Sequence, residues 1–473
     1  MKGHAAGVQL DDAIPSSVRV ILEALWSYGH AAYVVGGSLR DALLGREPAD
    51  WDLATDARPD RVLAIFPGSV YENRFGTVAV RSGDDVHEIT TFRIDHEYAD
   101  FRRPHRVEFG DDIRQDLARR DFTVNAMAWG ADQPRRATIG GSAASRSPSA
   151  RPIPNLVDPF EGQRDVEARL LRAVGDPRAR FEEDALRMVR AVRLAATLDF
   201  TIESRTLDAI REKAPLARHL SGERLALELE KVLAAARPSV GLRLLGETGL
   251  LDVLSPELAA QRGVPQNKIE DEDLWDHTVG TVDAAPADRP VVRLAALVHD
   301  IGKPATIEDG PFRGHEVVGA TLAAELLDRL RMPKAVTERV SHLVRHHMFT
   351  YDPDWGDAGV RRFIKRVGRE ELEDLFALRA ADSVGSGLAP DAGGLDELRA
   401  RVGEQLAASA VLDRGGLAVD GDDLIRELDL SPGPTLGRIL DRLLERVIAD
   451  PAANDRPTLL LLAEGMLADE AVG

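Results

Sequence analysis

The amino-acid sequence predicts an α+β fold, with a small head built on a mixed sheet and an all-α body behind it. Three observations support this prediction. Apolar residues between positions 16 and 92 alternate between helical and strand-like spacing. Beyond about residue 160, nearly every apolar stretch follows the 3.6-residue helical period, as in LRMVRAVRLAATL at 186–198. The length of 473 residues also exceeds what one hydrophobic core usually holds, which indicates several domains.

The head begins with one helix and one short strand. Residues 16–28 have helical apolar spacing, and AAYVV at 31–35 is a short apolar run typical of a buried strand. The glycine pair that follows, Gly36 and Gly37, predicts a turn into a short helix. We expect the strands of this sheet to run mostly parallel, because helices separate the early ones.

Further strands and a helix complete the predicted head. DWDLAT at 50–55 is a second strand, and a helix at 59–66 opens on a proline, which is tolerated at a first helical position. Residues 77–92 alternate between apolar and polar types around a central Gly-Asp pair, which predicts a hairpin. The head ends near residue 130. The next stretch, 131–154, is rich in Gly, Ser, Pro and Arg and predicts a flexible surface insertion.

Composition narrows the class of protein. The chain has no cysteine, which excludes disulfides, thiolate metal ligands and cysteine nucleophiles. We find no apolar run of about 18 residues and no apolar segment typical of a secretory signal, so we expect a cytoplasmic protein without a membrane partner. The formal net charge of −19 does not exclude an RNA partner, because phosphate contacts depend on local basic groups.

A phosphate and metal site is indicated just after the first strand. Gly36 and Gly37 let the backbone approach a phosphate closely, and they precede a helix N-terminus that carries Arg40. The two-residue spacing of Asp50 and Asp52 places both carboxylates on one side of a strand, where they can share hard cations such as Mg²⁺. This arrangement is typical of two-metal phosphoryl or nucleotidyl transfer.

The RRDFTVNA motif adds groups suited to a nucleotide. It contains Arg120, Asp121 and Asn125 within six residues. An arginine can neutralise phosphate charge, and the carboxylate and amide can hydrogen-bond ribose hydroxyls.

The EEDALRMVRAVR motif predicts a continuous helix with functional groups on one face. Asp184, Arg187 and Arg190 follow one another at three-residue spacing, which brings them roughly to the same side. An ordinary surface ion pair between Asp184 and Arg187 is the alternative interpretation.

These motifs belong to a longer ordered series, which reads VGGSLRD, DWD, EITTFR, RRDFTVNA, DPFEG, EDALR and SGER. In that order the chain resembles the tRNA nucleotidyltransferase family, the CCA-adding enzymes of the bacterial class, which share a superfamily with bacterial poly(A) polymerases. The resemblance covers roughly the first half of the chain. It implies a nucleotidyltransferase head, CTP and ATP as substrates, Mg²⁺ as the catalytic metal and tRNA, not DNA, as the partner.

The resemblance also implies roles for the first group of residues. Asp50 and Asp52 bind the catalytic Mg²⁺ ions in this reading. Gly36, Gly37 and Arg40 hold the triphosphate.

A second group of implied roles concerns phosphate, ribose and a loop. Arg120 and Asp121 match the family's phosphate- and ribose-binding pair. The segment 95–106, with Arg102 and Arg103, resembles the flexible loop that helps the change from C to A addition.

The EDALR helix carries the implied base recognition. Glu183, Asp184 and Arg187 would read the Watson–Crick edges of CTP and ATP, with Arg190 near the phosphates. An arginine and a carboxylate suit this task, because cytosine and adenine each offer an exocyclic amine beside a ring acceptor nitrogen. Glu88 is a candidate for a third carboxylate near the metals.

A second constellation lies far along the chain. LAALVHDIGKPAT carries a His-Asp pair at the end of an apolar helix and resembles the HD domain of metal-dependent phosphohydrolases. The resemblance implies a mononuclear site of His277, His299, Asp300 and Asp382, whose imidazole and carboxylate ligands suit a divalent transition metal. The other histidines in this part of the chain that we consider companions are His315, His346 and His347.

We expect five parts along the chain. In order these are the nucleotidyltransferase head (16–130), the flexible insertion (131–154), a helical nucleotide-recognition and RNA-binding region (155–265), the HD domain (266–385) and a C-terminal helical segment (395–470).

The sequence favours addition of CCA to tRNA and leaves two alternatives open. A poly(A) polymerase, or a partial enzyme that adds only CC or only A, shares all of these motifs. The second alternative, from another class, is an HD phosphohydrolase whose head only binds RNA.

Overall fold

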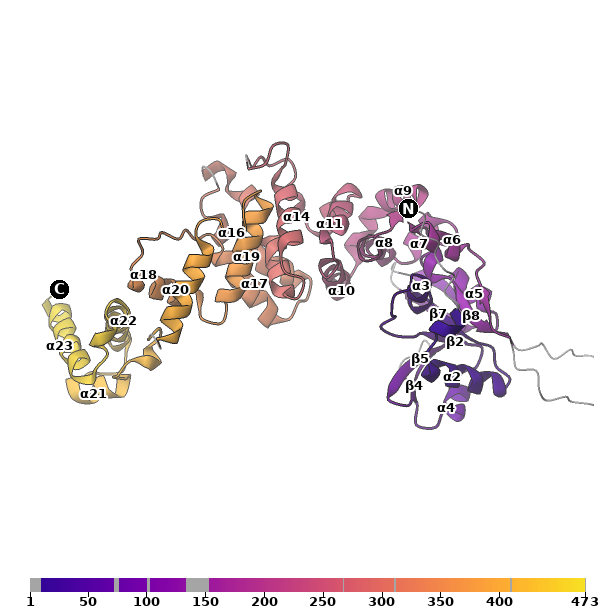
Figure 1. The fold of residues 1–473 in the computed structure, drawn as a ribbon, viewed down its shortest axis with the longest axis horizontal. Helices are drawn as coiled ribbons and strands as arrows, with labels where there is room; N and C mark the ends of the chain where they lie inside the picture. The colour runs from indigo at the N-terminus through magenta and orange to yellow at the C-terminus, as the bar shows by residue number, and fades with distance from the viewer. Residues whose placement is uncertain are drawn as a thin grey trace, which may run out of the picture. The chain divides into compact units, whose positions relative to one another are not determined.

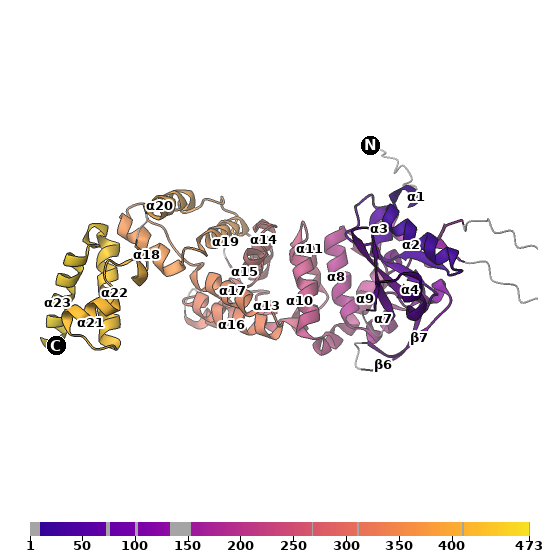
Figure 2. The same ribbon diagram turned by 90° about the horizontal axis from the view of Figure 1, so that it is seen from below.

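The computed structural model describes residues 10–71, 76–99, 103–132, 153–266, 268–309, 312–408 and 411–472. The chain forms two compact units, residues 1–254 and 255–473. The named sheet strands lie in the first unit, and the described part of the second unit is helical (Figures 1 and 2). The predicted α+β class, with a mixed sheet followed by a helical body, is therefore confirmed.

The first part of the N-terminal unit surrounds the sheet. Its elements in chain order are α1 (Leu10–Ala13), α2 (Ser16–Ser27), β1 (Ala32–Val35), α3 (Gly37–Leu43), β2 (Leu53–Thr55), α4 (Pro59–Ile65), β3 (Val70–Tyr71), β4 (Thr77–Ser82), β5 (Asp85–Thr91), β6 (Arg93–Ala99), β7 (Arg103–Phe109), α5 (Ile113–Ala118), β8 (Ala128–Ala131) and β9 (Asn155–Val157). The predicted hairpin is present, because β4 and β5 pair with Ser82 opposite Asp85.

The main sheet has the strand order β3-β4-β5-β2-β1-β8-β9. Only the β2–β5 pair is parallel; all its other neighbouring strands are antiparallel. The expectation of mostly parallel strands is therefore wrong. The short helix α3 does not carry the chain across the sheet as a crossover helix would; the chain turns and comes back beside β1.

This antiparallel return decides where the functional residues lie. The backbone N–H of Val35, at the end of β1, donates to the carbonyl oxygen of Asp52, just before β2, at 3.0 Å. The segment between them therefore leaves β1 and enters β2 at the same end of these two strands. A parallel crossover would have separated the glycine turn from Asp52 by the length of a strand.

The core of the head forms around β1. All four residues of β1 are buried, and the ring of Tyr33 lies 6.1 Å from that of Phe92. Gly130 on β8 pairs with Tyr33, and a Cβ at Gly130 would lie 2.2 Å from the carbonyl oxygen of Ala32. Only glycine permits this approach of β8 to β1.

The sheet continues beyond the predicted end of the head. β9 pairs with β8, with Asn155 opposite Gly130, so the chain leaves and rejoins the sheet at neighbouring positions. Most of the predicted insertion, residues 133–152, lies outside the described residues. The predicted loop at 95–106 overlaps β6 and β7, which form an antiparallel pair; Arg102 and the side chain of Arg103 lie outside the described part.

The rest of the N-terminal unit is mainly helical. Its elements are α6 (Gly162–Glu167), β10 (Leu170–Leu171), α7 (Pro177–Glu183), α8 (Leu186–Leu198), β11 (Thr201–Ile202), α9 (Ser204–Lys213), α10 (Gly222–Leu233), α11 (Pro238–Glu247) and α12 (Leu250–Leu254). The expected continuous helix over 182–193 is wrong, because α7 ends at Glu183. Asp184 has extended backbone (φ −148°, ψ 105°), and its Oδ1 accepts the N–H of Leu186 at 3.0 Å, at the start of α8.

The C-terminal unit consists of packed helices. They are α13 (Pro256–Ala259), α14 (Leu274–Ala284), α15 (Pro290–Val298), α16 (His315–Arg329), α17 (Lys334–His346), α18 (Asp357–Val367), α19 (Leu372–Gly385), α20 (Leu395–Ala407), α21 (Gly421–Leu428), α22 (Pro434–Ala449) and α23 (Arg456–Val472). α14, α15, α17 and α19 contact one another, and α21, α22 and α23 share a separate apolar cluster that includes Leu424, Leu443 and Leu459. Among the described residues, we find no helix both long and apolar enough to cross a lipid bilayer.

Candidate functional site

A cleft of about 440 Å³ opens in the N-terminal unit, between the edge of the sheet and the start of α8. The segments next to the ends of β1 and β2 contribute Gly36, Gly37 and Asp52 to its lining. The second wall begins where α7 gives way to α8 and includes Asp184 and Arg187. The fold thus brings the glycine turn and the EDALR motif to one cavity, although more than 130 residues separate Asp52 from Asp184.

The glycine turn lies directly beside a carboxylate and an arginine. Gly36 has φ +80° and ψ −140°, a conformation that L side chains rarely adopt. A Cβ there would lie 2.9 Å from Nη1 of Arg120 and 3.6 Å from Oδ2 of Asp52. Any residue larger than glycine would therefore enter the space between these two charged groups.

Arg40 lies behind this turn and does not line the cleft. Its guanidinium donates to Oδ1 of Asn125 at 2.6 Å and to both carboxylate oxygens of Asp41 at 2.9 Å. A Cβ at Gly37 would be 3.4 Å from the same guanidinium. In this structure Arg40 therefore packs against the glycine turn at Gly37 and fixes the side chain of Asn125 by a hydrogen bond.

Asp50 and Asp52 lie just before β2, not within it. Asp52 is accessible from the cleft, but the surrounding protein and the carboxylate of Asp50 raise its pKa, while Arg120 opposes them. Two neighbouring carboxylates favour a bound cation, because it offsets the repulsion between their charges, and this suits the chemistry predicted for them. In the parallel pair of β2 and β5, Leu53 lies opposite Ile89. Asp52 comes directly before Leu53 and Glu88 directly before Ile89, so the two acids occupy equivalent positions on neighbouring strands.

A buried acid fixes the two arginines of the RRD motif. Asp116 is 1% exposed and accepts from Arg119 at 2.6 Å and from Arg120 at 3.4 Å. Burial acts to raise the pKa of Asp116, but Arg119 and Arg120 outweigh it and hold that pKa below its usual value. Asp116 therefore stays charged and orients both guanidinium groups in the wall of the cleft.

Asp121 joins the RRD motif to α8. Its Oδ2 accepts from Arg190 at 2.6 Å, and its Oδ1 accepts the N–H of Phe122 at 2.9 Å and the amide of Asn125 at 3.4 Å. Burial acts to raise the pKa of Asp121, but Arg190 outweighs it and lowers the pKa to about 2. Both residues of this pair line the cleft.

The pair expected to read the base has partners that the sequence did not reveal. Oδ2 of Asp184 accepts from Arg224 of the SGER motif at 2.6 Å, so it does not pair with Arg187 as a simple surface bridge would. Arg187 donates to Glu183 at 2.6 Å, to the carbonyl of Arg180 at 3.2 Å and to that of Arg119 at 3.0 Å. Glu183 does not line the cleft; it holds Arg187 in place.

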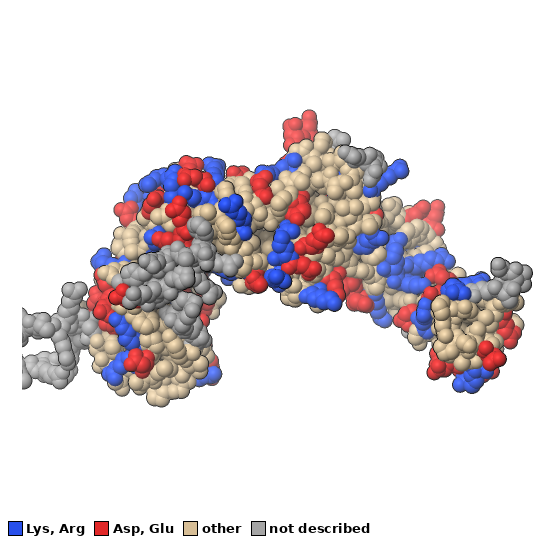
Figure 3. All heavy atoms as spheres, turned by 180° about the vertical axis from the view of Figure 1, so that it is seen from behind, with Lys and Arg blue, Asp and Glu red and all other residues tan. Residues whose placement is uncertain are grey.

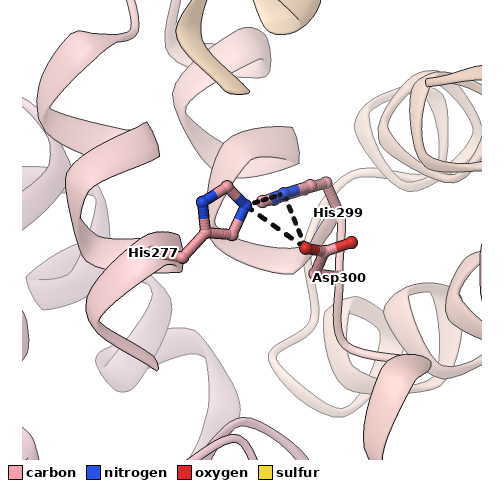
Figure 4. Close-up of side chains that lie close together, drawn as sticks. All are labelled: His277, His299 and Asp300. Atoms are coloured by element: carbon pink, nitrogen blue, oxygen red, sulfur yellow. Dashed lines mark hydrogen bonds and ion pairs between the residues drawn. The ribbon is translucent and has the colours of Figure 1, made fainter. Parts of the chain in front are cut away.

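The second constellation is a buried cluster in the C-terminal unit. Nε2 of His277 lies 3.1 Å from Nε2 of His299, 3.3 Å from Oδ2 of Asp300 and 3.2 Å from Oδ1 of Asp382 (Figure 4 shows the first three residues). His299 and Asp300 come from the end of α15, His277 from α14 and Asp382 from α19. The four residues predicted for a mononuclear site are thus brought together.

Two more histidines reach the same acid, and one does not. Nε2 of His315 lies 3.2 Å from Oδ1 of Asp300, and Nε2 of His347 lies 3.6 Å from it. His346 instead lies beside His342, with ring centroids 4.5 Å apart and the ring planes tilted by 54°. Both His277–His299–Asp300 and Asp300–His315–His347 have the spacing of groups that could hold a metal ion.

Family models match three successive parts of this chain. A poly A polymerase head domain matches residues 32–172, a probable RNA and SrmB-binding site of polymerase A matches 199–262, and an HD domain matches 269–385. A CCA-adding enzyme from Geobacillus kaustophilus is 34% identical over 445 residues, covering 92% of this chain and 93% of that protein. One from Streptococcus suis is 30% identical and covers 99% of this chain and 100% of that protein. The chain belongs to the CCA-adding enzyme family.

Solved structures of CCA-adding enzymes share the fold. The Bacillus stearothermophilus CCA-adding enzyme in complex with CTP has a TM-score of 0.68 and 27% identity, covering 97% of this chain and 100% of that one. The Thermotoga maritima CCA-adding enzyme complexed with tRNA has a TM-score of 0.53 at 19% identity, with 97% of each chain covered, and this likeness concerns the fold alone.

The sequence analysis did not single out two residues that line the cleft of the N-terminal unit, Asp116 and Arg224. Asp116 carries no motif signal of its own, because it lies one helical turn before the RRD string and acts through burial. Arg224 lies within SGER, which pointed to the family, but no spacing argument connects it to Asp184, 40 residues earlier.

Proposed function

We propose that this protein adds C, C and A to the 3′ end of tRNA, using CTP and ATP and releasing pyrophosphate. The observation that carries the proposal is the single cleft in which Asp52 and the glycine turn face Asp184 and Arg187. A nucleotide bound there has groups suited to its triphosphate at one end and to its base at the other. Relatives named CCA-adding enzymes, at 30–34% identity over nearly the whole chain, support the same conclusion.

The reaction is an in-line displacement at phosphorus. The 3′-hydroxyl oxygen of the RNA forms a bond to the α-phosphorus, the bond from that phosphorus to the oxygen shared with the β-phosphate breaks, and pyrophosphate leaves. The hydroxyl proton passes to solvent. Asp50 and Asp52 would hold Mg²⁺, which supplies positive charge for the hydroxyl and the leaving group. The residues present fit this ion. Burial and the charge of Asp50 both raise the pKa of Asp52, and a bound cation would offset the negative charge of the two carboxylates.

The cationic walls of the cleft bind the rest of the nucleotide in this proposal. Arg120 and Arg190 neutralise phosphate oxygens, and each is already oriented by a buried aspartate. Asp121 and Asn125 accept and donate hydrogen bonds at the ribose. Arg40 acts beneath the glycine turn by holding Asn125, and Gly36 keeps the approach to the phosphates open.

Base selection is assigned to Asp184 and Arg187. Each offers a planar hydrogen-bonding edge, and both line the cleft in fixed positions, because Arg224 holds Asp184 and Glu183 holds Arg187. We propose that the reaction takes place in the cytoplasm.

The test combines a substitution with an assay on tRNA that lacks its 3′ end. Asp52→Asn is expected to reduce incorporation of both C and A by more than about 100-fold, beyond the roughly 10- to 100-fold cost of losing an outer-shell group at a metal site. Asp60→Asn, an exposed acid in the first turn of α4, is the matched control and should retain activity. Unimpaired addition by the Asp52 variant would refute the site.

The same assay separates the alternatives. With CTP alone the expected product carries two added C residues, and CTP with ATP completes CCA. Extension of homopolymer RNA by ATP alone would instead identify a poly(A) polymerase, and a product that stops at CC with both nucleotides would identify a partial enzyme.

The buried histidine cluster favours a second activity, phosphohydrolysis in the HD domain. We assign a divalent transition metal to His277, His299, Asp300 and Asp382. In phosphohydrolysis a water oxygen bonds to phosphorus, the ester P–O bond breaks, and the alcohol leaves with a proton from that water. The fit is good for His277 and His299, because Nδ1 of each donates to a backbone carbonyl, at 3.0 and 2.8 Å, which leaves the Nε2 lone pairs facing each other. Loss of Ni²⁺ or Co²⁺ binding in Asp300→Asn would support the assignment; unchanged binding would exclude it.

A further inference from the structure

The hairpin of β4 and β5 has one covered face and one open face. On the covered face Val78, Val80 and Ile89 are buried, and Nε2 of His87 lies 3.1 Å from Oγ of Ser17 in the first turn of α2. Successive side chains of a strand point to opposite faces, so the residues between these point away from α2. The open face consists of Thr77, Ala79, Arg81, Val86, Glu88 and Thr90.

The open face is continuous with the nucleotide cleft of the head. Oγ1 of Thr77 on β4 lies 3.2 Å from Oγ1 of Thr90 on β5, which confirms that both side chains are on one face. Both residues line the cleft, together with Asp52 and Ala54. Ala54 on β2 is the register partner of Thr90. The sheet face that borders the cleft therefore extends from Asp52 across β5 to β4.

The part of this face outside the cleft carries exposed apolar and basic side chains. Val86 is 56% exposed, and its register partner Arg81 is also exposed. Val70 on β3, opposite Ala79, extends the face and is 63% exposed. Within the described part of the chain, the guanidinium of Arg81 has no ion pair, in contrast to the arginines of the cleft. A phosphate can therefore bind Arg81 without displacing a carboxylate.

Arg81 and Val86 lie close to the acid proposed to hold Mg²⁺. Glu88 on β5 occupies the position equivalent to Asp52, and Val86 lies two residues before Glu88. Neighbouring strands are about 4.8 Å apart, and alternate residues of one strand are about 6.8 Å apart. These spacings place the Cα atoms of Val86 and Arg81 roughly 8 and 12 Å from that of Asp52. The last nucleotides of a chain whose 3′-hydroxyl lies at Asp52 can reach both residues.

In-line displacement determines the side from which the RNA arrives. The attacking hydroxyl and the leaving pyrophosphate lie on opposite sides of the α-phosphorus. The glycine turn that follows β1 suits the phosphates, because Gly36 leaves the space beside Arg120 open. In the sheet, β2 lies between β1 and β5. A pyrophosphate over the glycine turn therefore requires the 3′-hydroxyl to approach Asp52 from the side of β5.

We propose that the open face of β4 and β5 binds the last nucleotides of the RNA 3′ end, with Arg81 at a phosphate and Val86 against a sugar or base. This inference rests on the proposed CCA addition and names the place of its RNA substrate. Single-stranded ends bind to surfaces that combine cations for the backbone with apolar contacts for the bases. Glu88 is the acid of this face, and its position beside Asp52 keeps it on the side of the reacting hydroxyl.

The test compares the KM for tRNA that lacks its 3′ end with the KM for CTP. Arg81→Ala is expected to raise the KM for tRNA by about tenfold, the cost of a lost charged hydrogen bond, and to leave the KM for CTP within about twofold. Arg61→Ala is the matched control and should change neither value. Arg61 is an exposed arginine of α4 whose guanidinium lies 5.7 Å from the ring centre of Tyr28, next to the end of α2.

Salt dependence distinguishes a phosphate contact from a general loss of structure. Loss of one phosphate contact to a single strand should make the plot of log KM for tRNA against log salt concentration less steep by about 0.7 in Arg81→Ala. Arg81→Lys keeps the cation and should retain the slope of the unaltered chain. The KM for tRNA in Arg81→Lys should stay within about threefold of that chain.

An added negative charge tests the apolar part of the face. Val86→Asp should raise the KM for tRNA by at least about tenfold, because the carboxylate repels the RNA backbone. Val20→Asp adds the same charge to the outer side of α2, where Val20 is 59% exposed, and should leave the KM for tRNA within about twofold. Circular dichroism checks that each variant is folded.

The outcomes separate this inference from the proposed function. An unchanged KM for tRNA in both Arg81→Ala and Val86→Asp, or an equal rise in the KM for CTP, would overturn the inference and leave CCA addition intact. A dimer in analytical ultracentrifugation that Val86→Asp dissociates would show that a second copy of the chain covers this face, and it would overturn the inference as well. If the unaltered chain does not extend tRNA, the proposed function itself fails.

Discussion

At the scale of single residues, the cleft of the head is organised by buried acids that hold arginines. Asp116 orients Arg119 and Arg120, and Asp121 orients Arg190. An arginine held by a carboxylate loses less conformational freedom when a phosphate binds, so these acids prepare the cleft for an anion. Their own charge is protected because the arginines outweigh the effect of burial on both pKa values.

The Asp121–Arg190 pair makes the stability of the head depend on pH. The pKa of Asp121 is about 2 in the folded chain and about 3.9 in an unfolded one, so its contribution is complete above about pH 5 and is lost as pH falls through 4 towards 2. Asp121→Asn is expected to lower the free energy of unfolding by about 2 kcal/mol at pH 7 and by about half as much at pH 3. Urea denaturation at several pH values measures the difference.

Asp56 provides a control of opposite sign for this experiment. Burial raises its pKa against the hydrogen bonds from His30 and the N–H of Ala31, so the stability it contributes falls as pH rises. The loss of unfolding free energy in Asp56→Asn, relative to the wild type, should therefore become smaller as the pH rises. A pH-independent loss in Asp121→Asn would show that the contact with Arg190 does not depend on the carboxylate charge.

At the scale of elements, the site depends on a turn that places the end of β1 beside the start of β2. β1 and β2 are antiparallel, so Gly36 and Asp52 become neighbours at the point where one strand ends and the other begins. The turn also lies against Arg120. Gly36 has a positive φ, and Nη1 of Arg120 lies so close to its Cβ position that no side chain fits there.

Gly36→Ala tests this turn against a second glycine with positive φ. Gly45 has φ +67° with nothing within 4 Å of its Cβ position. Both alanine variants should lose about 1 kcal/mol or more of stability from backbone strain. Only Gly36→Ala should also lose nucleotide incorporation, by at least about tenfold, because its methyl group displaces Arg120. Equal activity of the two variants in the tRNA assay would contradict a role for this turn in catalysis.

The elements also show which features the sequence could predict. The hairpin of β4 and β5, the helix after Pro59 and the helical body follow from local spacing and turn residues, and these were predicted correctly. The antiparallel direction of β1 and β2 and the break at Asp184 depend on contacts made elsewhere in the chain, and both expectations were wrong. Apolar periodicity continues through Asp184, so no local signal marks the side-chain bond that starts α8.

The candidate sites divide in the same way. The motifs contain several residues that line the head cleft, such as Asp52 and Asp184, but also Arg40 and Glu183, which do not line it. They gave no sign that Arg224 bonds to Asp184, because that contact depends on the fold. In the HD domain, proximity in sequence made His346 and His347 equal candidates. Only the end of α17 decides that His347 turns towards Asp300 while His346 lies beside His342.

At the scale of the whole molecule, the two proposed chemistries belong to separate compact units. The head cleft lies within residues 1–254 and the histidine cluster within 255–473, and each unit has its own internal contacts. Acidic and basic side chains are interspersed over much of the face in Figure 3, with a larger group of Lys and Arg on the C-terminal unit. Local basic surface of this kind allows a chain of net charge −19 to bind RNA.

Separate units predict separate effects of a ligand on unfolding. We expect Co²⁺ to bind the histidine cluster only when the C-terminal unit is folded. In the chain with both Asp50 and Asp52 changed to Asn, a free Co²⁺ concentration of 100 times the Kd should therefore stabilise the C-terminal unit by about 2.7 kcal/mol. The stability of the N-terminal unit should not change. Scanning calorimetry should then show two transitions of which Co²⁺ raises one, and His299→Asn should remove that rise while tRNA extension by the native head stays within about twofold. A single transition that Co²⁺ raises as a whole would instead mean that the units unfold together, and loss of CCA addition in His299→Asn would mean that the histidine cluster acts on the head.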